Sequence, residues 1–101
     1  MILHCVFCNV QDGGHQEITE VMQELAEFSR GLEGVHRFDY GPNRDFEAKS
    51  QDHDCGFVIA FDTAAALQHY ADHPTHKALG ARLCNLCNGG AAGIVVYDIE
   101  A

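Results

Sequence analysis

The segment YADHPTH, residues 70–76, decides how the second half of the chain folds. The residues before it, TAAALQHYAD, are typical of a helix, but Pro74 disfavours helical dihedral angles at His73. Proline is also a good first residue for a new helix, which here extends from Thr75 to about Cys87. The sequence therefore predicts two consecutive helices with a corner between them, and two histidines at that corner.

Segments typical of strands surround these helices in a β-α-β-β-α-β order. The strands are predicted at residues 2–10, 34–41, 55–62 and 93–100, and an amphipathic helix from Gln16 to about Leu32. A polar connection from Arg44 to Asp54 is predicted to be a solvated loop, with a lid as the alternative. This order predicts an α+β, ferredoxin-like fold in one domain, residues 1–101, with a four-stranded antiparallel sheet and helices on one face.

The strands are apolar on both of their sides. Alternation along the first strand places Ile2, His4, Val6, Cys8 and Val10 on one side and Leu3, Cys5, Phe7 and Asn9 on the other. The last strand behaves in the same way, with Ile94 and Val96 opposite Val95, Tyr97 and Ile99. Because helices cover only one face of the sheet, we expect a homodimer in which two sheets pack against each other.

Composition excludes several classes of partner. Six Lys and Arg residues stand against 15 Asp and Glu residues, and the net charge of −9 repels nucleic acid and anionic membrane surfaces. No apolar run approaches the roughly 20 residues of a membrane span, and the start of the chain does not have the pattern of a signal peptide. We therefore expect a cytoplasmic protein whose five cysteines stay reduced.

Three side chains are candidates for acid–base chemistry. Leu67 and Tyr70 share one helix face, and His76 is in line with Leu79 on the next helix, so both ring side chains are predicted to point toward the sheet. His4 points toward them if its side of the strand lies beneath the helices. A neutral imidazole beside a phenol is a suitable pair for proton transfer near pH 7. The alternative is that these groups only form hydrogen bonds within the core.

Metal and cofactor sites are not predicted. His73 is expected to cap the new helix or to reach across the dimer. A metal held by His73 and His76 would need a third ligand, such as His69 or Asp72, and the proline corner breaks the regular spacing of such motifs. The chain also has no glycine-rich phosphate loop, nucleophile elbow or paired-carboxylate signature.

Two Cys-x-x-Cys pairs are interpreted as structural. Cys5 and Cys8 are three residues apart on a strand, so their side chains point to opposite faces and cannot bind one ion together. Cys84 and Cys87 share a helix face, but they lie at the carboxyl end, where the helix dipole disfavours a thiolate.

The Tyr-x-x-His-Pro-x-His pattern, together with His4, the GPN turn at 41–43 and the closing VVYDIE, resembles the stress-responsive dimeric α/β-barrel (Dabb) family. The resemblance covers nearly the whole chain and implies two subunits whose sheets form a joint barrel. Most relatives have no defined biochemical role. A plant branch, typified by olivetolic acid cyclase, catalyses an aldol-type cyclisation of polyketide thioesters without a cofactor.

The resemblance also implies roles for individual residues. Tyr70 and His76 match the residues of the cyclase branch that bind and deprotonate the polyketide, and His4 matches a further pocket residue. Cys55 stands where that branch has another pocket histidine, so the same substrate is not expected.

These observations favour a homodimer that binds a small apolar molecule or has a protective role, with no cofactor. One alternative is a cofactor-independent enzyme in which His76 is the base and Tyr70 polarises the carbonyl group of a β-keto-type substrate. Another is a ferredoxin-like monooxygenase that binds haem or acts on quinones, because such enzymes share the dimeric barrel.

Overall fold

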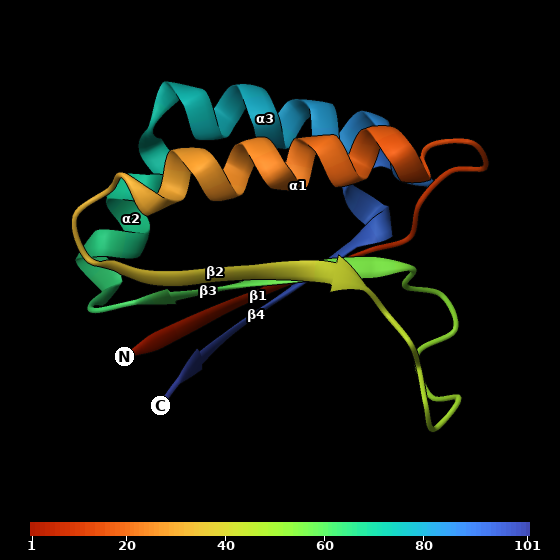
Figure 1. The fold of residues 1–101 in the computed structure, drawn as a ribbon, viewed down its shortest axis with the longest axis horizontal. Coiled ribbons are helices and arrows are strands. Elements are labelled where there is room, and N and C mark those ends of the chain that lie inside the picture. The colour runs from red at the N-terminus through yellow and green to blue at the C-terminus, as the bar shows by residue number, and fades with distance from the viewer.

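The computed structural model describes residues 1–101 and has the predicted ferredoxin-like fold. Its elements are β1 (Ile2–Cys8), α1 (His15–Arg30), β2 (Val35–Pro42), β3 (Cys55–Phe61), α2 (Ala64–Asp72), α3 (Pro74–Asn85), a short 3-10 helix η1 (Gly90–Gly93) and β4 (Ile94–Glu100). The four strands form one antiparallel sheet in the order β2-β3-β1-β4. Figure 1 shows the helices on one side of the sheet and no element on the other.

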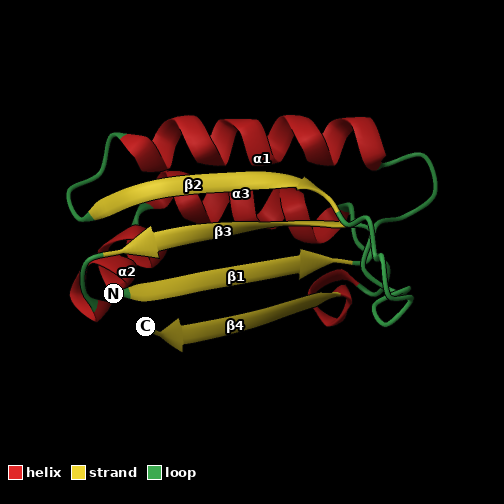
Figure 2. Cartoon of the chain, turned by 60° about the horizontal axis from the view of Figure 1, so that its bottom comes forward, coloured by secondary structure: helices red, strands yellow, loops and turns green.

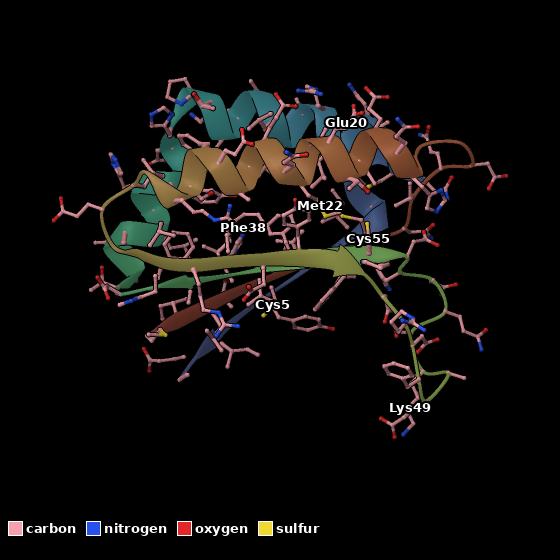
Figure 3. The ribbon with its side chains drawn as sticks, in the orientation of Figure 1. Cys5, Glu20, Met22, Phe38, Lys49 and Cys55 are labelled. Atoms are coloured by element: carbon pink, nitrogen blue, oxygen red, sulfur yellow. The ribbon has the colours of Figure 1, made fainter.

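The hydrophobic core fills the space between the helices and the sheet. From α1 it takes Ile18, Val21, Met22, Leu25 and Ala26, which recur at helical spacing and are all buried. From the sheet it takes the helix-facing positions of β1 and β3, among them Val6, Phe57, Ile59 and Phe61. Figure 3 shows Met22 and Phe38 pointing into this layer, whereas Glu20 points from α1 into solvent.

The corner between α2 and α3 forms as the sequence predicts. Pro74 is the first residue of α3, and His73 before it has an extended backbone conformation. The Nδ1 atom of His73 accepts a hydrogen bond from the backbone N–H of Thr75 at 3.1 Å, so His73 caps the new helix. At the start of α2, Thr63 is the cap and accepts from the N–H of Ala66.

Two local features differ from the expectations. Helix α3 ends at Asn85 rather than near Cys87, and η1 follows it before β4. The helix ends there because the N–H groups of Leu86 and Cys87 bond to carbonyls three residues back, and Cys87 then forms a β-bridge with Val10. The glycine pair at 89 and 90, with left-handed φ angles of 74° and 64°, lies between this point and η1.

The loop at residues 43–54 is exposed, as predicted, but it has a defined internal structure. The Oδ1 atom of Asp45 accepts hydrogen bonds from the N–H groups of Lys49 and Ser50 and from the hydroxyl of Ser50. Phe46 lies in this loop with 88% of its side chain exposed. In Figures 1 and 3 the loop extends beyond the sheet on its uncovered side, with Lys49 near its far end.

The uncovered side of the sheet is largely apolar. We call it the open face, and it carries Leu3, Cys5, Phe7, Val58, Ala60, Val95, Tyr97 and Ile99. Tyr97 and Ile99 are 57% and 51% exposed. Figure 2 shows all four strands with no helix in front of them. None of the helices combines the length and the apolar character that crossing a membrane requires.

Candidate functional site

Tyr70 lies at the centre of a cluster of aromatic rings beneath the α2–α3 corner. Its ring centroid is 4.4 Å from that of His76 and 6.1 Å from that of His4. Phe61 of β3 and Phe28 of α1 complete the surroundings, at 5.4 and 6.2 Å. The three candidates from the sequence therefore come together, Tyr70 from the last turn of α2, His76 from the first turn of α3 and His4 from β1.

The hydroxyl of Tyr70 is buried and has no hydrogen-bond partner. Tyr70 is only 1% exposed, and burial raises the pKa of its phenol well above the ordinary value. The group therefore stays protonated and is an unpaired hydrogen-bond donor in an apolar environment. Such a group costs about 1–3 kcal/mol of stability, so native proteins seldom retain one without a reason.

His76 presents one free ring nitrogen at this site. Its Nδ1 atom donates a hydrogen bond to the backbone carbonyl of Ala71 at 2.9 Å. Because Nδ1 carries the proton in this arrangement, Nε2 has the free lone pair. Burial lowers the pKa of the half-buried ring, and the nearby charges of His4 and Lys77 act in the same direction. His76 is therefore neutral at pH 7 and competent to accept a proton or a hydrogen bond through Nε2.

Asp98 contacts the candidate site through His4, and the sequence analysis missed it. His4 and Asp98 are directly opposite each other on β1 and β4, and the Nδ1 atom of His4 donates to the Oδ1 atom of Asp98 at 2.6 Å. This contact orients the ring and leaves Nε2 of His4 as the other hydrogen-bonding atom. The two residues are 94 positions apart, and only the strand register shows their pairing.

The lowered pKa of His76 predicts a pH-dependent stability. Protonation is easier in the unfolded chain, whose histidine pKa is about 6.5, than in the folded protein. This part of the stability is fully present above the unfolded pKa and is lost as the pH falls through the lower folded value. We expect the free energy of unfolding to fall less in the His76→Gln variant than in the unaltered protein between about pH 7.5 and about pH 5. Urea unfolding at both pH values measures this difference. An equal loss in the free energy of unfolding in the two proteins would contradict the lowered pKa of His76.

The remaining histidines and cysteines have structural contacts. His73 contacts Phe28, with ring centroids 4.6 Å apart, in addition to its capping role. Cys5 lies on the open face and Cys8 in the core, so their side chains diverge as predicted. No group of three or more His, Cys, Asp or Glu side chains is placed to hold a metal ion.

Three cysteines that are distant in sequence meet in the core. The thiol of Cys8 lies beside those of Cys55 and Cys87, and all three residues are buried. The interaction between the Cys8 and Cys55 thiols, together with burial, raises the pKa of Cys8, and the same interaction lowers the pKa of Cys55. Burial raises the pKa of Cys87. The three cysteines meet at the last residue of β1, whereas His4 lies near the first, so Cys55 is not part of the Tyr70 site.

A surface hollow of the chain is separate from this site. It has a volume of about 870 Å³ and lies between the open face and the 43–54 loop, with Phe7, Tyr40, Val58 and Tyr97 among its lining residues. Tyr70, His76 and His4 do not line it. The rings of the candidate site pack on one another, and around the buried Tyr70 the rings of His4, Phe28 and His76 are only partly buried.

Comparisons with known proteins agree with this architecture. A dimeric ferredoxin-like protein of unknown function from Jannaschia sp. CCS1 is 40% identical, with a TM-score of 0.94 over 99% of this chain and 98% of that chain. The At3g17210 protein of Arabidopsis thaliana is 20% identical, with a TM-score of 0.85 over 100% and 95%. An antibiotic biosynthesis monooxygenase is 14% identical, with a TM-score of 0.79 over 100% and 98%. The last two show the fold alone. No curated protein gives a significant match.

The fold and the pair formed by the buried Tyr70 and the half-buried His76 define the class as a ferredoxin-like α+β protein with a histidine–tyrosine cluster between sheet and helices. The chain belongs to the stress-responsive A/B barrel (Dabb) family, whose model matches residues 2–101. Membership of the family is confirmed, as the sequence predicted.

Proposed function

We propose that this protein is a cytoplasmic homodimer that binds a small, mostly apolar molecule with a carbonyl oxygen at the Tyr70 site. The observation that carries the proposal is the buried Tyr70 hydroxyl without a partner. A ligand carbonyl would accept its hydrogen bond and remove the cost of the unpaired donor. The surrounding rings of Phe28, Phe61 and His4 favour an apolar body for the ligand.

Ligand binding is tested with ethyl acetoacetate, a small β-keto ester. We expect chemical-shift changes in the ring signals of Tyr70 and His76 on titration, and an affinity at least about tenfold lower in the His76→Ala variant. His69→Ala is the matched control, because His69 is an exposed histidine of α2 that does not cap α3. Shifts confined to other residues would contradict the proposed site. Mass spectrometry of the purified protein under native conditions would detect a molecule that remains bound.

Dimerisation is the second part of the proposal. The open face is apolar and no helix of the chain covers it, and the relative from Jannaschia sp. CCS1 is described as dimeric. The 43–54 loop extends past this face and carries the exposed Phe46, which suits contact with a second copy. The five cysteines are all free thiols, which suits a reducing compartment.

Proton transfer is a second candidate function, favoured by the free Nε2 atom of the neutral His76. In that reaction Nε2 takes a proton from the carbon next to the carbonyl group. The electron pair of the broken C–H bond moves to the carbonyl oxygen, and the resulting enolate oxygen accepts a hydrogen bond from the Tyr70 hydroxyl. No cofactor takes part in this step.

Hydrogen–deuterium exchange distinguishes catalysis from binding alone. If the protein is an enzyme, it will accelerate the exchange of the acidic C–H protons of ethyl acetoacetate in D₂O, and the His76→Ala variant will not. A protein that binds the ester without accelerating exchange is a binding protein. The monooxygenase alternative is tested by the absorbance spectrum of the purified protein, which would reveal bound haem.

A further inference from the structure

Gly80 occupies the middle of α3, where glycine weakens a helix relative to alanine. Its backbone does not explain the choice of residue, because Gly80 is not among the glycines with positive φ. No close approach of another element explains it either. A Cβ atom placed at Gly80 would meet a single heavy atom within 4 Å outside the local helix backbone, the Nε2 atom of His76 at 4.0 Å.

The position of Gly80 therefore borders the free nitrogen of the candidate site. His76 and Gly80 are four residues apart and share one face of α3. Helical side chains lean toward the amino-terminal end of their helix and cover the preceding turn. A larger side chain at position 80 would consequently lie over His76. Gly80 itself is partly exposed, so the space that its missing side chain leaves is open to solvent.

We propose that Gly80 is a specificity-determining residue, because the space above it is the opening through which a ligand reaches Nε2 of His76. The apolar part of the ligand lies against the bare backbone of α3 at Gly80, while its carbonyl group faces Tyr70. The inference rests on the proposed function, and it adds the route of entry and the residue that limits the size of the ligand.

Diethyl pyrocarbonate tests this route without a known ligand. The unprotonated Nε2 atom attacks one carbonyl carbon of the reagent, so that an N–C bond forms and the C–O bond to the other half breaks, which releases ethyl carbonate. The ethyl carbonate takes up the proton that the imidazole loses and decomposes into ethanol and carbon dioxide. Peptide mass mapping then measures the rate of modification at His76 separately from the other histidines. The rate is compared in the unaltered protein and in the Gly80→Ala, Gly80→Leu and Ala81→Leu variants.

We expect His76 to react in the unaltered protein, about tenfold or more slowly in Gly80→Leu, and at an intermediate rate in Gly80→Ala. Ala81→Leu is the matched control, because it adds the same side chain one position further along α3, on an exposed part of the helix. It should leave the rate at His76 unchanged. Gly80→Ala should also melt at a temperature several degrees higher, so its slower modification cannot result from unfolding.

Two results would overturn the inference. One is a His76 that does not react in the unaltered protein, which would show that Nε2 has no open approach. The other is an equal rate in Gly80→Leu and the unaltered protein, which would place the approach elsewhere. Failure of the proposed function is distinguishable from both. In that case ethyl acetoacetate would not bind at Tyr70, while leucine at position 80 would still shield His76 from the reagent.

Discussion

The Tyr97→Asp variant is expected to have the 11.1 kDa mass of a single chain in solution, and the unaltered protein is expected to have twice that mass. Tyr97 is 57% exposed on the open face of one chain, so the substitution removes little from the fold of that chain. Packing two sheets together would bury the new carboxylate without a partner, which costs several kcal/mol. By two-fold symmetry each dimer carries the change twice, so we expect dimer dissociation to become at least about a thousandfold more favourable.

Val96→Asp is the matched control for this prediction. Val96 is the neighbour of Tyr97 on β4 and is 48% exposed, but it points to the helix side of the sheet. Light scattering at micromolar concentration should give a dimer for Val96→Asp and a monomer for Tyr97→Asp. If the unaltered protein is itself a monomer, the open face is not a dimer interface.

Tyr70→Phe is expected to stabilise the protein and to abolish most of its ligand binding. The substitution removes a buried hydroxyl that has no partner and leaves the packed ring in place, so the free energy of unfolding should rise by about 1–2 kcal/mol. The same substitution removes the donor for the ligand carbonyl, and the affinity for ethyl acetoacetate should fall about tenfold or more. Opposite changes in stability and binding are the mark of a group retained for function.

Urea unfolding and NMR titration measure these two quantities on the same sample. Tyr40→Phe is the control, because Tyr40 is 37% exposed and its hydroxyl is not trapped in the core, so neither quantity should change. A less stable Tyr70→Phe protein would mean that the hydroxyl is already satisfied in the folded chain. If the variant is more stable but its affinity for ethyl acetoacetate is unchanged, the Tyr70 hydroxyl does not contact the ligand.

The candidate site was only partly predictable from the sequence. Helical spacing correctly directed Tyr70 and His76 toward the sheet, and strand alternation placed His4 on the side of the sheet that the helices cover. Asp98 escaped detection because its role depends on which residue of β1 lies opposite it. Register is a long-range property that a periodic pattern does not specify. Gly80 escaped for a similar reason, because its significance depends on where the ring of His76 points.

The cysteines illustrate the same limit. Their spacing suggested two local pairs, and strand geometry correctly separated Cys5 from Cys8. The contacts of Cys8 are instead with Cys55 and Cys87, which come from a neighbouring strand and from the chain after α3. Local spacing describes neighbours along the chain, whereas a packed core selects neighbours across it.

The sequence by itself determined the order of the elements and the corner between α2 and α3. Each of these features depends on local physics, such as the fixed φ of Pro74, the capping side chain of His73 and the periodicity of apolar residues. Tertiary structure alone decided that the Tyr70 hydroxyl would be buried without a partner and that Asp98 would hold His4. Burial and hydrogen bonding depend on the sum of contacts from distant segments, and those contacts exist only after the sheet and helices have packed.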